Sequence, residues 1–206
     1  STLGGMNFLC HALPYLDDPL VAVATAVPDL LSVVDRKIRA RERMAVGGLE
    51  SDDAAVRAVA RGILHHIHDD RWFHGTEAFV QSNLELAVAL RDRLPGDRGF
   101  RPMFVSHVVI EVLLDAFWIR DQPDLARDYY RLIDATDPEL VQSCVNRITG
   151  KPTDNLAATI RRFADARFLY DYLEHERLLL RLNQVMRRVG LDKLPQSVIP
   201  WLQYGE

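Results

Sequence analysis

The sequence predicts an all-α protein, a single-domain helical bundle of about seven to nine helices. Apolar residues recur at helical spacing along most of the 206 residues. Runs that alternate apolar and polar residues between hairpin turns, the pattern typical of β-strands, are scarce. Proline, glycine and charged clusters divide the chain into blocks of helical length. We expect one domain over residues 6–206, with residues 1–5 a tag remnant or a disordered start.

Short helices are expected before the first glycine pair. Residues 6–16 predict a short apolar helix or an extended lead-in, and residues 19–26 a second apolar segment. Pro28 either starts a new helix in its first turn or kinks a continuing one. The basic segment 35–43 is typical of a solvated face, and Gly47-Gly48 predicts a break.

Longer helices are expected after that break. Ser51-Asp52-Asp53 is typical of a helix start, and apolar spacing continues from there to His74-Gly75. Thr76 is a candidate cap for the next helix. A loop is expected over 95–99, a helix over 102–119, and helix starts at Pro123 and at 136–139. After a break over 150–152, one or two helices are expected over 155–189, with Gly190 as C-cap. The tail over 194–206 is expected to be loop-like, with Trp201 as a docking anchor.

Composition narrows the class of protein. The net charge of −4 and pI near 6.0 argue against a generic nucleic-acid binder. Two cysteines are too few for a disulfide framework, so a reducing, cytoplasmic location is expected. No run of about 18 apolar residues predicts a membrane span, and the start lacks a signal-peptide pattern.

Histidines and aspartates concentrate in residues 62–74, which hold four of the seven histidines. In a helix, His66, Asp70 and His74 stand at i, i+4 and i+8 and so form one polar stripe. Imidazoles and carboxylates on a rigid rod are typical ligands of a divalent metal. A solvated polar face is the alternative.

A second stripe with the same spacing lies in an apolar stretch and consists of His107, Glu111 and Asp115. Buried carboxylates are costly without a partner, so they predict a cation, a basic side chain or donors from another helix. A structural salt-bridge network is the alternative. Because both stripes lie on apolar helices, we expect them to face each other.

His11 and Asp29 complete the set of candidates, since each is a polar residue within an apolar segment. Taken alone, His11 fits a satisfied core histidine, and Asp29 fits a carboxylate in the first turn of a helix.

These residues lie in motifs that resemble the acyl carrier protein phosphodiesterase family. Met6-Asn7-Phe8-Leu9-Cys10-His11 is similar to its opening Met-Asn-Phe-Leu-x-His, and Asp29 falls at its next acidic position. Gly62-Ile63 with His66 and Asp70 is similar to its Gly-Ile-x-x-His-x-x-x-Asp. Residues 110–117 resemble its Leu-Asp-x-x-x-Asp-His-Phe. The resemblance covers residues 6 to 120.

The resemblance implies an HD-domain-like all-α fold, related to the metal-dependent phosphohydrolases. It implies a divalent metal and cleavage of phosphopantetheine from acyl carrier protein. Carried over by position, the metal ligands are His11, Asp29, His66 and Asp70. Histidines and acidic residues four apart on apolar helices also resemble the zinc-dependent phospholipase C group.

The chain departs from the family pattern at several positions. His74 stands where the family has an acidic residue, Ile67 and His68 where it has an arginine pair, and Ala116 where it has histidine. Losing the arginines removes bidentate phosphate donors. An extra histidine ligand, His74 or His107, favours zinc, iron or manganese over magnesium.

The leading hypothesis is a metal-dependent phosphoric-ester hydrolase acting on a small phosphorylated substrate or on acyl carrier protein, with no nucleic-acid or membrane partner. Arg61 and Arg71 are the candidates for phosphate contact. A non-enzymatic helical scaffold and an iron oxygenase are the alternatives, and a homodimer through the C-terminal leucines is a further one, with core packing preferred. The expected ligands are His11, Asp29, His66, Asp70 and His107, and the expected catalytic groups are Asp70, Glu111, Asp115 and His74.

Overall fold

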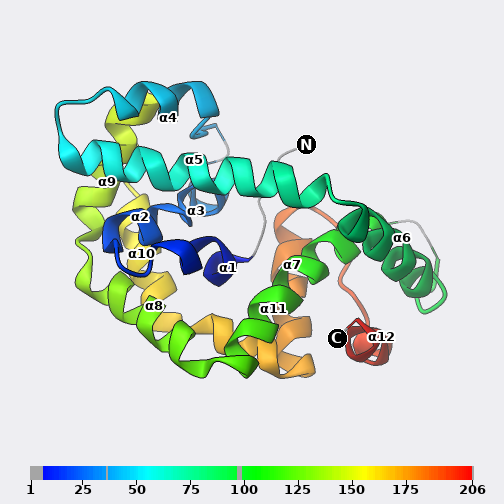
Figure 1. The fold of residues 1–206 in the computed structure, drawn as a ribbon. Coiled ribbons are helices and arrows are strands. Elements are labelled where there is room, and N and C mark those ends of the chain that lie inside the picture. The colour runs from blue at the N-terminus through cyan, green and yellow to red at the C-terminus, as the bar shows by residue number, and fades with distance from the viewer. Residues whose placement is uncertain (1–6, 36, 97–98, 206) are drawn as a thin grey trace. The chain divides into compact units, whose positions relative to one another are not determined.

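The computed structural model describes residues 7–35, 37–96 and 99–205, and these residues form helices and no strand. The all-α prediction is therefore confirmed (Figure 1). The α-helices are α1 (Phe8–Ala12), α2 (Pro19–Ala24), α3 (Val27–Val34), α4 (Glu42–Leu49), α5 (Ala54–His74), α6 (Glu77–Arg91), α7 (Pro102–Asp121), α8 (Pro123–Ala135), α9 (Pro138–Thr149), α10 (Leu156–Ala166), α11 (His175–Arg188) and α12 (Ile199–Tyr204). The 3₁₀-helices are η1 (Leu13–Tyr15), η2 (Phe168–Leu173) and η3 (Gln196–Val198).

The described residues contain more helices than the seven to nine predicted, because proline divides the N-terminal apolar stretch into short ones. Pro19 opens α2, and the Asp18 carboxylate accepts a hydrogen bond from the Val21 amide at 3.5 Å. Pro28 lies in the first turn of α3, so it starts a new helix rather than kinking a continuing one.

The break predicted at Gly47-Gly48 is wrong, because both glycines lie inside α4. A Cβ atom on Gly48 would lie 2.9 Å from Ala60 Cβ and 3.0 Å from Ile148 Cγ1. The glycine therefore allows α4 to approach α5 and α9 closely. Composition alone indicated a turn, whereas the reason for the glycine is helix packing.

The long helix α5 begins and ends where the sequence predicts. Asp53 accepts a hydrogen bond from the Ala55 amide at 2.9 Å, and the helix continues for 21 residues to His74. At Gly62, a Cβ atom would lie 2.5 Å from the Val21 carbonyl oxygen and 2.7 Å from Ala24 Cβ. Only glycine therefore permits this contact between α5 and α2.

Contacts within the chain group into two compact units. The first consists of residues up to Arg71 together with Gln122–Arg167, and the second of Trp72–Asp121 together with the chain from Phe168 onward. The predicted boundaries 6–206 stay a prediction, and residues 1–5 lie outside the described residues.

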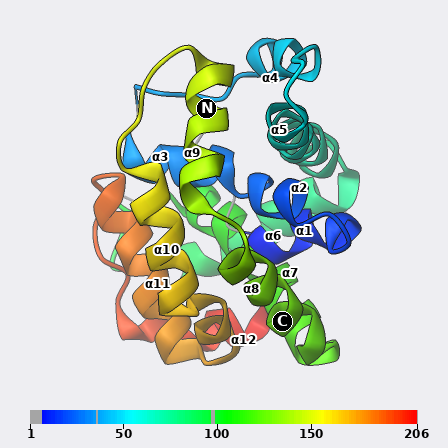
Figure 2. The same ribbon diagram turned by 90° about the vertical axis from the view of Figure 1, so that its left-hand side faces the viewer.

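In the first unit, α5 extends past α4, and α9 and α10 lie side by side (Figures 1 and 2). The basic segment before α4 is solvated as predicted, since Lys37, Arg39, Arg41 and Arg43 are exposed. The core consists of buried side chains from α2, α3, α5, α9 and α10, including Val21, Leu31, Val59, Ile63, Val145, Leu156 and Ile160.

In the second unit, α7 packs against α6, η2 and α11. Leu178, Leu179 and Leu182 are buried on α11, which fits core packing, whereas Leu180 is exposed. The loop-like tail is wrong in part, because η3 and α12 form there. Trp201 is its anchor as predicted: it is fully buried and donates a hydrogen bond from Nε1 to the Leu86 carbonyl at 2.9 Å.

Within the described residues, one helix, α7, is long and apolar enough to cross a membrane by length and composition only. Its most apolar 18-residue window has a mean hydropathy of 1.6 and is 56% buried within the structure. A buried core helix meets the same criteria, so α7 is weak grounds for a membrane span.

Candidate metal centres

The first group of candidate ligands lies in the first unit and is called here the His11 cluster: His11, Asp29, His66, Asp69 and Asp70. The helices α1, α3 and α5 supply these residues. One ligating atom each from His11, His66 and Asp70 lies within 4.8 Å of the other two. His66 Nε2 lies 3.9 Å from Asp29 Oδ1 and 3.4 Å from Asp70 Oδ2. The four residues that the family resemblance assigns to the metal are therefore neighbours.

Burial and charge give the His11 cluster unusual acid–base properties. His11, Asp29 and His66 are 1%, 4% and 4% exposed. Burial disfavours the imidazolium of His11, but the carboxylates of Asp69 and Asp70 outweigh it and raise the pKa of His11 to about 10. Burial also opposes ionisation of Asp70, yet the two imidazoles beside it lower the pKa of its carboxyl group.

Asp69 is a member of the cluster that sequence reasoning missed. Its Oδ2 lies 2.8 Å from His11 Nδ1, and this hydrogen bond lowers the pKa of Asp69. A carboxylate on one ring nitrogen fixes the tautomer that presents the other nitrogen to a metal. The adjacent aspartates Asp69 and Asp70 could have indicated both as candidates. Helical spacing from His66, however, selects Asp70 alone.

The donor set of the His11 cluster fits a divalent metal. His11 Nε2 and Asp70 Oδ1 are buried and 3.2 Å apart, without the alignment of a hydrogen bond between them. Two such atoms facing each other are what a shared ion would join. A mixture of imidazole nitrogen and carboxylate oxygen ligands suits zinc, iron or manganese. The carboxylate oxygens would also allow magnesium to bind.

A second group lies in the second unit and is called the His74 cluster: His74, His107 and Glu111. Its three ligating atoms also lie within 4.8 Å of one another. His107 was expected in one metal set with His66, but it belongs to this group, because α7 carries it one turn before Glu111. His74, expected as a catalytic group, lies here as well.

Asp115 follows Glu111 by one turn of α7, and both carboxylates have no exposed surface. Asp115 belongs to neither group of ligating atoms found among the described residues. A general acid or base must come within hydrogen-bond reach of its substrate. The burial of Glu111 and Asp115 therefore gives their predicted catalytic roles no support.

The arginines expected to contact phosphate are engaged with carboxylates. Arg61 pairs with Asp18. Arg71 Nη2 lies 2.6 Å from Glu42 Oε2, and Glu42 Oε1 lies 2.8 Å from His68 Nε2. These exposed pairs are weak and exchangeable. Because His68 and Arg71 lie one turn apart on α5, Glu42 contacts the face of this helix that lies opposite to Asp69 and Asp70.

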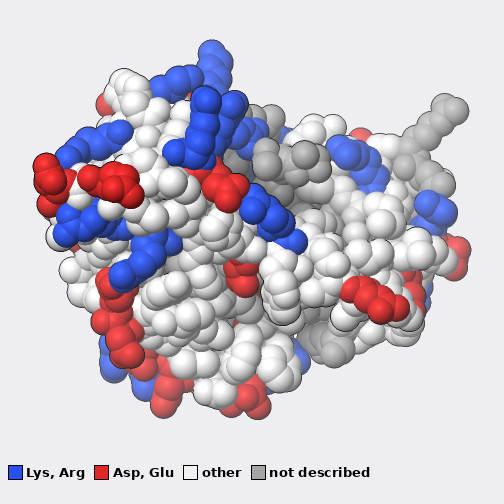
Figure 3. Space-filling model, turned by 45° about the horizontal axis from the view of Figure 1, so that its top comes forward, with Lys and Arg blue, Asp and Glu red and all other residues white. Residues whose placement is uncertain are grey.

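Basic side chains gather in the upper left part of the face shown in Figure 3, with a few acidic ones among them. Such a concentration of positive charge attracts anionic partners locally although the net charge of the chain is negative.

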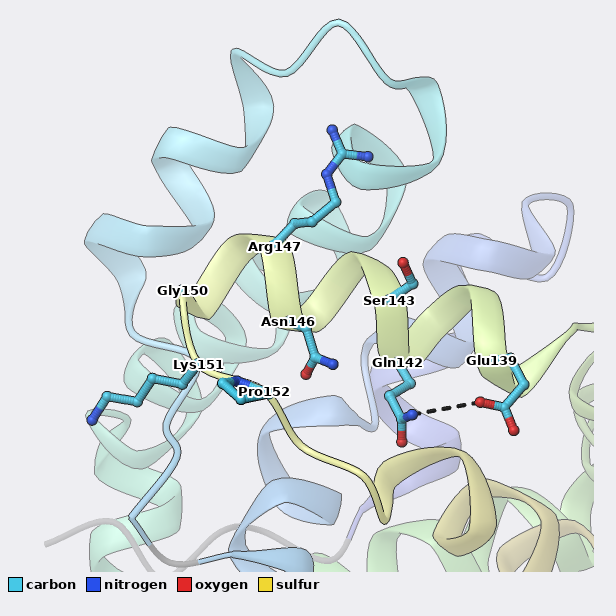
Figure 4. A pocket seen from close by; sticks show the side chains of 8 residues that line it. All are labelled: Glu139, Gln142, Ser143, Asn146, Arg147, Gly150, Lys151 and Pro152. Atoms are coloured by element: carbon cyan, nitrogen blue, oxygen red, sulfur yellow. Dashed lines mark hydrogen bonds between the residues drawn. The ribbon is translucent and has the colours of Figure 1, made fainter.

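A polar hollow of about 590 Å³ opens beside α9 (Figure 4). Gln142 donates a hydrogen bond to Glu139 at its rim, and Arg147 pairs with Asp53. None of the predicted site residues lines it. Its lining residues are Glu139, Gln142, Ser143, Asn146, Arg147, Gly150, Lys151 and Pro152.

No protein-family model, no curated protein and no solved structure matches the chain. The geometry of the two clusters is therefore the main guide to function.

Proposed function

We propose that the chain is a metal-dependent phosphoric-ester hydrolase whose site is the His11 cluster. The observation that carries the proposal is the convergence of His11, His66 and Asp70 within 4.8 Å. These residues come from helices far apart in the sequence. Burying such groups together is costly unless they are paired or hold an ion.

A divalent metal bound there would polarise a phosphoryl oxygen and lower the pKa of a bound water to about 7. The side chains of the His11 cluster would hold this metal and fix its position. His11 presents Nε2 while Asp69 holds its Nδ1. His66 and Asp29 supply a buried nitrogen and a buried carboxylate. Asp70, with a side chain 22% exposed, marks the side open to a substrate.

The substrate class proposed is a phosphoric ester with an anionic carrier. The exposed basic residues of segment 37–43 would attract such a ligand to the first unit. Together with the resemblance to the acyl carrier protein phosphodiesterases, this favours phosphopantetheine on acyl carrier protein as the first substrate to test. An HD-type fold, a cytoplasmic location and the absence of a nucleic-acid partner belong to the same proposal.

A non-enzymatic helical scaffold is the second candidate, and specific observations favour it. Ile67 and His68 stand where the family has arginines, and Arg61 and Arg71 are engaged by Asp18 and Glu42. Both arginines expected to contact phosphate are therefore paired with carboxylates of the chain itself.

Activity measurements separate the two candidates. Untagged protein is analysed for metals as purified, then assayed with bis-p-nitrophenyl phosphate and with holo-acyl carrier protein under added Mn²⁺, Mg²⁺, Zn²⁺ or Fe²⁺. The hydrolase predicts bound metal and metal-dependent turnover that chelation abolishes. Absence of both would reject it in favour of the scaffold, whereas intact holo-acyl carrier protein alone would reject only that substrate. Oxygen uptake by an iron-loaded sample would indicate an oxygenase instead.

A further inference from the structure

We propose that the His74 cluster is a second metal site, independent of the proposed hydrolase site, that takes a transition metal such as Zn²⁺. All three ligands belong to the second unit: His74 at the end of α5, and His107 and Glu111 on α7. The site requires nothing from the His11 cluster.

The geometry of the cluster centres on one carboxylate oxygen. Glu111 Oε1 lies 2.7 Å from His74 Nε2 and 3.1 Å from His107 Nε2. The two rings are 4.4 Å apart between centroids. Two nitrogens and one oxygen thus converge from two helices. Two histidines with one carboxylate form a recurrent three-ligand set for zinc and for non-haem iron.

The complete burial of the Glu111 carboxylate favours a compensating cation beside it. Glu111 has no exposed surface, and Asp115 lies equally buried one turn further along the same helix. Removing a carboxylate from water costs several kcal/mol after relaxation unless a cation or strong donors compensate. The two histidines hydrogen-bond to this carboxylate, and a divalent ion between the three groups would add compensating charge.

Neighbouring side chains hold the two imidazoles in place. The ring of Phe79 lies 4.8 Å from His74 and 4.9 Å from His107, centroid to centroid. Thr76 positions Phe79, because its hydroxyl accepts a hydrogen bond from the Phe79 amide at 3.2 Å. Ser106, next to His107, donates to the Asn83 carbonyl at 3.1 Å and so joins α7 to α6. Ligands fixed in this way bind with little loss of side-chain entropy.

The exposure of the rings leaves a path for an ion. The side chains of His74 and His107 are 27% and 28% exposed. Three protein ligands with one open side leave a coordination position for water or another ligand. The nitrogen share of the donor set favours zinc or iron over magnesium and calcium, which prefer oxygen.

The test is a count of bound metal in the full, untagged chain after chelation and titration with Co²⁺ or Zn²⁺. His66→Ala disables the His11 cluster and should still bind one equivalent. His66→Ala with His74→Gln should bind the metal at least about 100-fold more weakly. Loss of a group that only hydrogen-bonds to a metal ligand already costs about 10–100-fold in affinity, and loss of the ligand itself should cost more. His68→Gln is the matched control, since it removes another α5 histidine that pairs with a carboxylate, Glu42, and should change nothing.

Two results would overturn the site. The first is a folded His66→Ala protein that binds no metal, and the second is unchanged binding after His74→Gln is added. Should the double variant fail to fold, His74→Gln alone decides, since this variant should bind one equivalent fewer than the wild-type chain. An unchanged number of equivalents would reject the site. Absence of hydrolase activity in the wild-type chain would reject only the function proposed for the His11 cluster, whereas loss of activity in His66→Ala is expected.

Discussion

The two clusters use the same residue types, but their histidines differ in burial. In the His11 cluster the imidazoles are buried, at 1% and 4% exposed, while the side chains of Asp69 and Asp70 are 33% and 22% exposed. In the His74 cluster the carboxylate of Glu111 has no exposed surface and the imidazoles are about one-quarter exposed. The same chemical groups therefore face different problems: a buried base among acids, and a buried acid among bases.

This difference predicts different metal-free states. His11 keeps its proton because nearby carboxylates outweigh burial. In the His74 cluster two imidazoles hydrogen-bond to one carboxylate oxygen, and a divalent ion would add charge there. A metal entering the His11 cluster must displace a proton, whereas one entering the His74 cluster replaces hydrogen bonds.

The largest expected effect that would separate the clusters is that of His66→Ala on hydrolysis. The variant should lower metal-dependent turnover by at least about 100-fold. Loss of a group that only hydrogen-bonds to a metal ligand already costs about 10–100-fold, and loss of the ligand itself should cost more. Turnover of bis-p-nitrophenyl phosphate at saturating Mn²⁺ measures it. His68→Gln, half-exposed on the same helix, is the control and should keep its rate. Equal losses in both variants would show that the helix, not the ligand, had been damaged.

Asp69→Asn should have the next largest effect. It replaces the carboxylate that accepts from His11 Nδ1 by an amide of the same shape. The expected loss is about 10–100-fold in metal affinity of the His11 cluster, with no change in the His74 cluster. Competition with a coloured chelator measures each affinity. An unchanged affinity would mean that Asp69 is only a surface neighbour of His11.

Gly62→Ala should destabilise the first unit while leaving the His74 ligands intact. The new methyl group would meet the Val21 carbonyl at 2.5 Å, and overpacking of this kind costs about 1–3 kcal/mol. Urea unfolding measures the change. Gly47→Ala is the matched control: its Cβ meets nothing within 4 Å, so alanine should stabilise α4 by about 0.5–1 kcal/mol. Equal effects of the two substitutions would contradict the packing role of Gly62.

Local spacing and long-range contact explain what the sequence could and could not predict. Helical spacing correctly paired His66 with Asp70 and His107 with Glu111, because residues four apart share a helix face. Spacing also placed His66 and His74 on one stripe, yet they join different clusters.

Contacts with residues distant in the sequence determine which cluster each histidine joins. His11 and Asp69 are 58 positions apart, and His74 and Glu111 are 37 apart. No local pattern encodes such contacts. Gly47-Gly48 was misread for the same reason, since only the fold shows that Ala60 and Ile148 pack against Gly48.

The last expected effect is the pH dependence of the metal-free protein. The pKa of His11 rises from 6.5 to about 10 on folding. A raised pKa contributes stability that is fully present below pH 6.5 and is lost as pH rises toward 10. The free energy of unfolding of chelated wild type should therefore fall over this range, and less so in His11→Gln. With Zn²⁺ the trend should weaken or reverse, because ligand nitrogens must be unprotonated to bind. Identical pH profiles for wild type and His11→Gln, measured by urea unfolding, would remove His11 from the charge balance of its cluster.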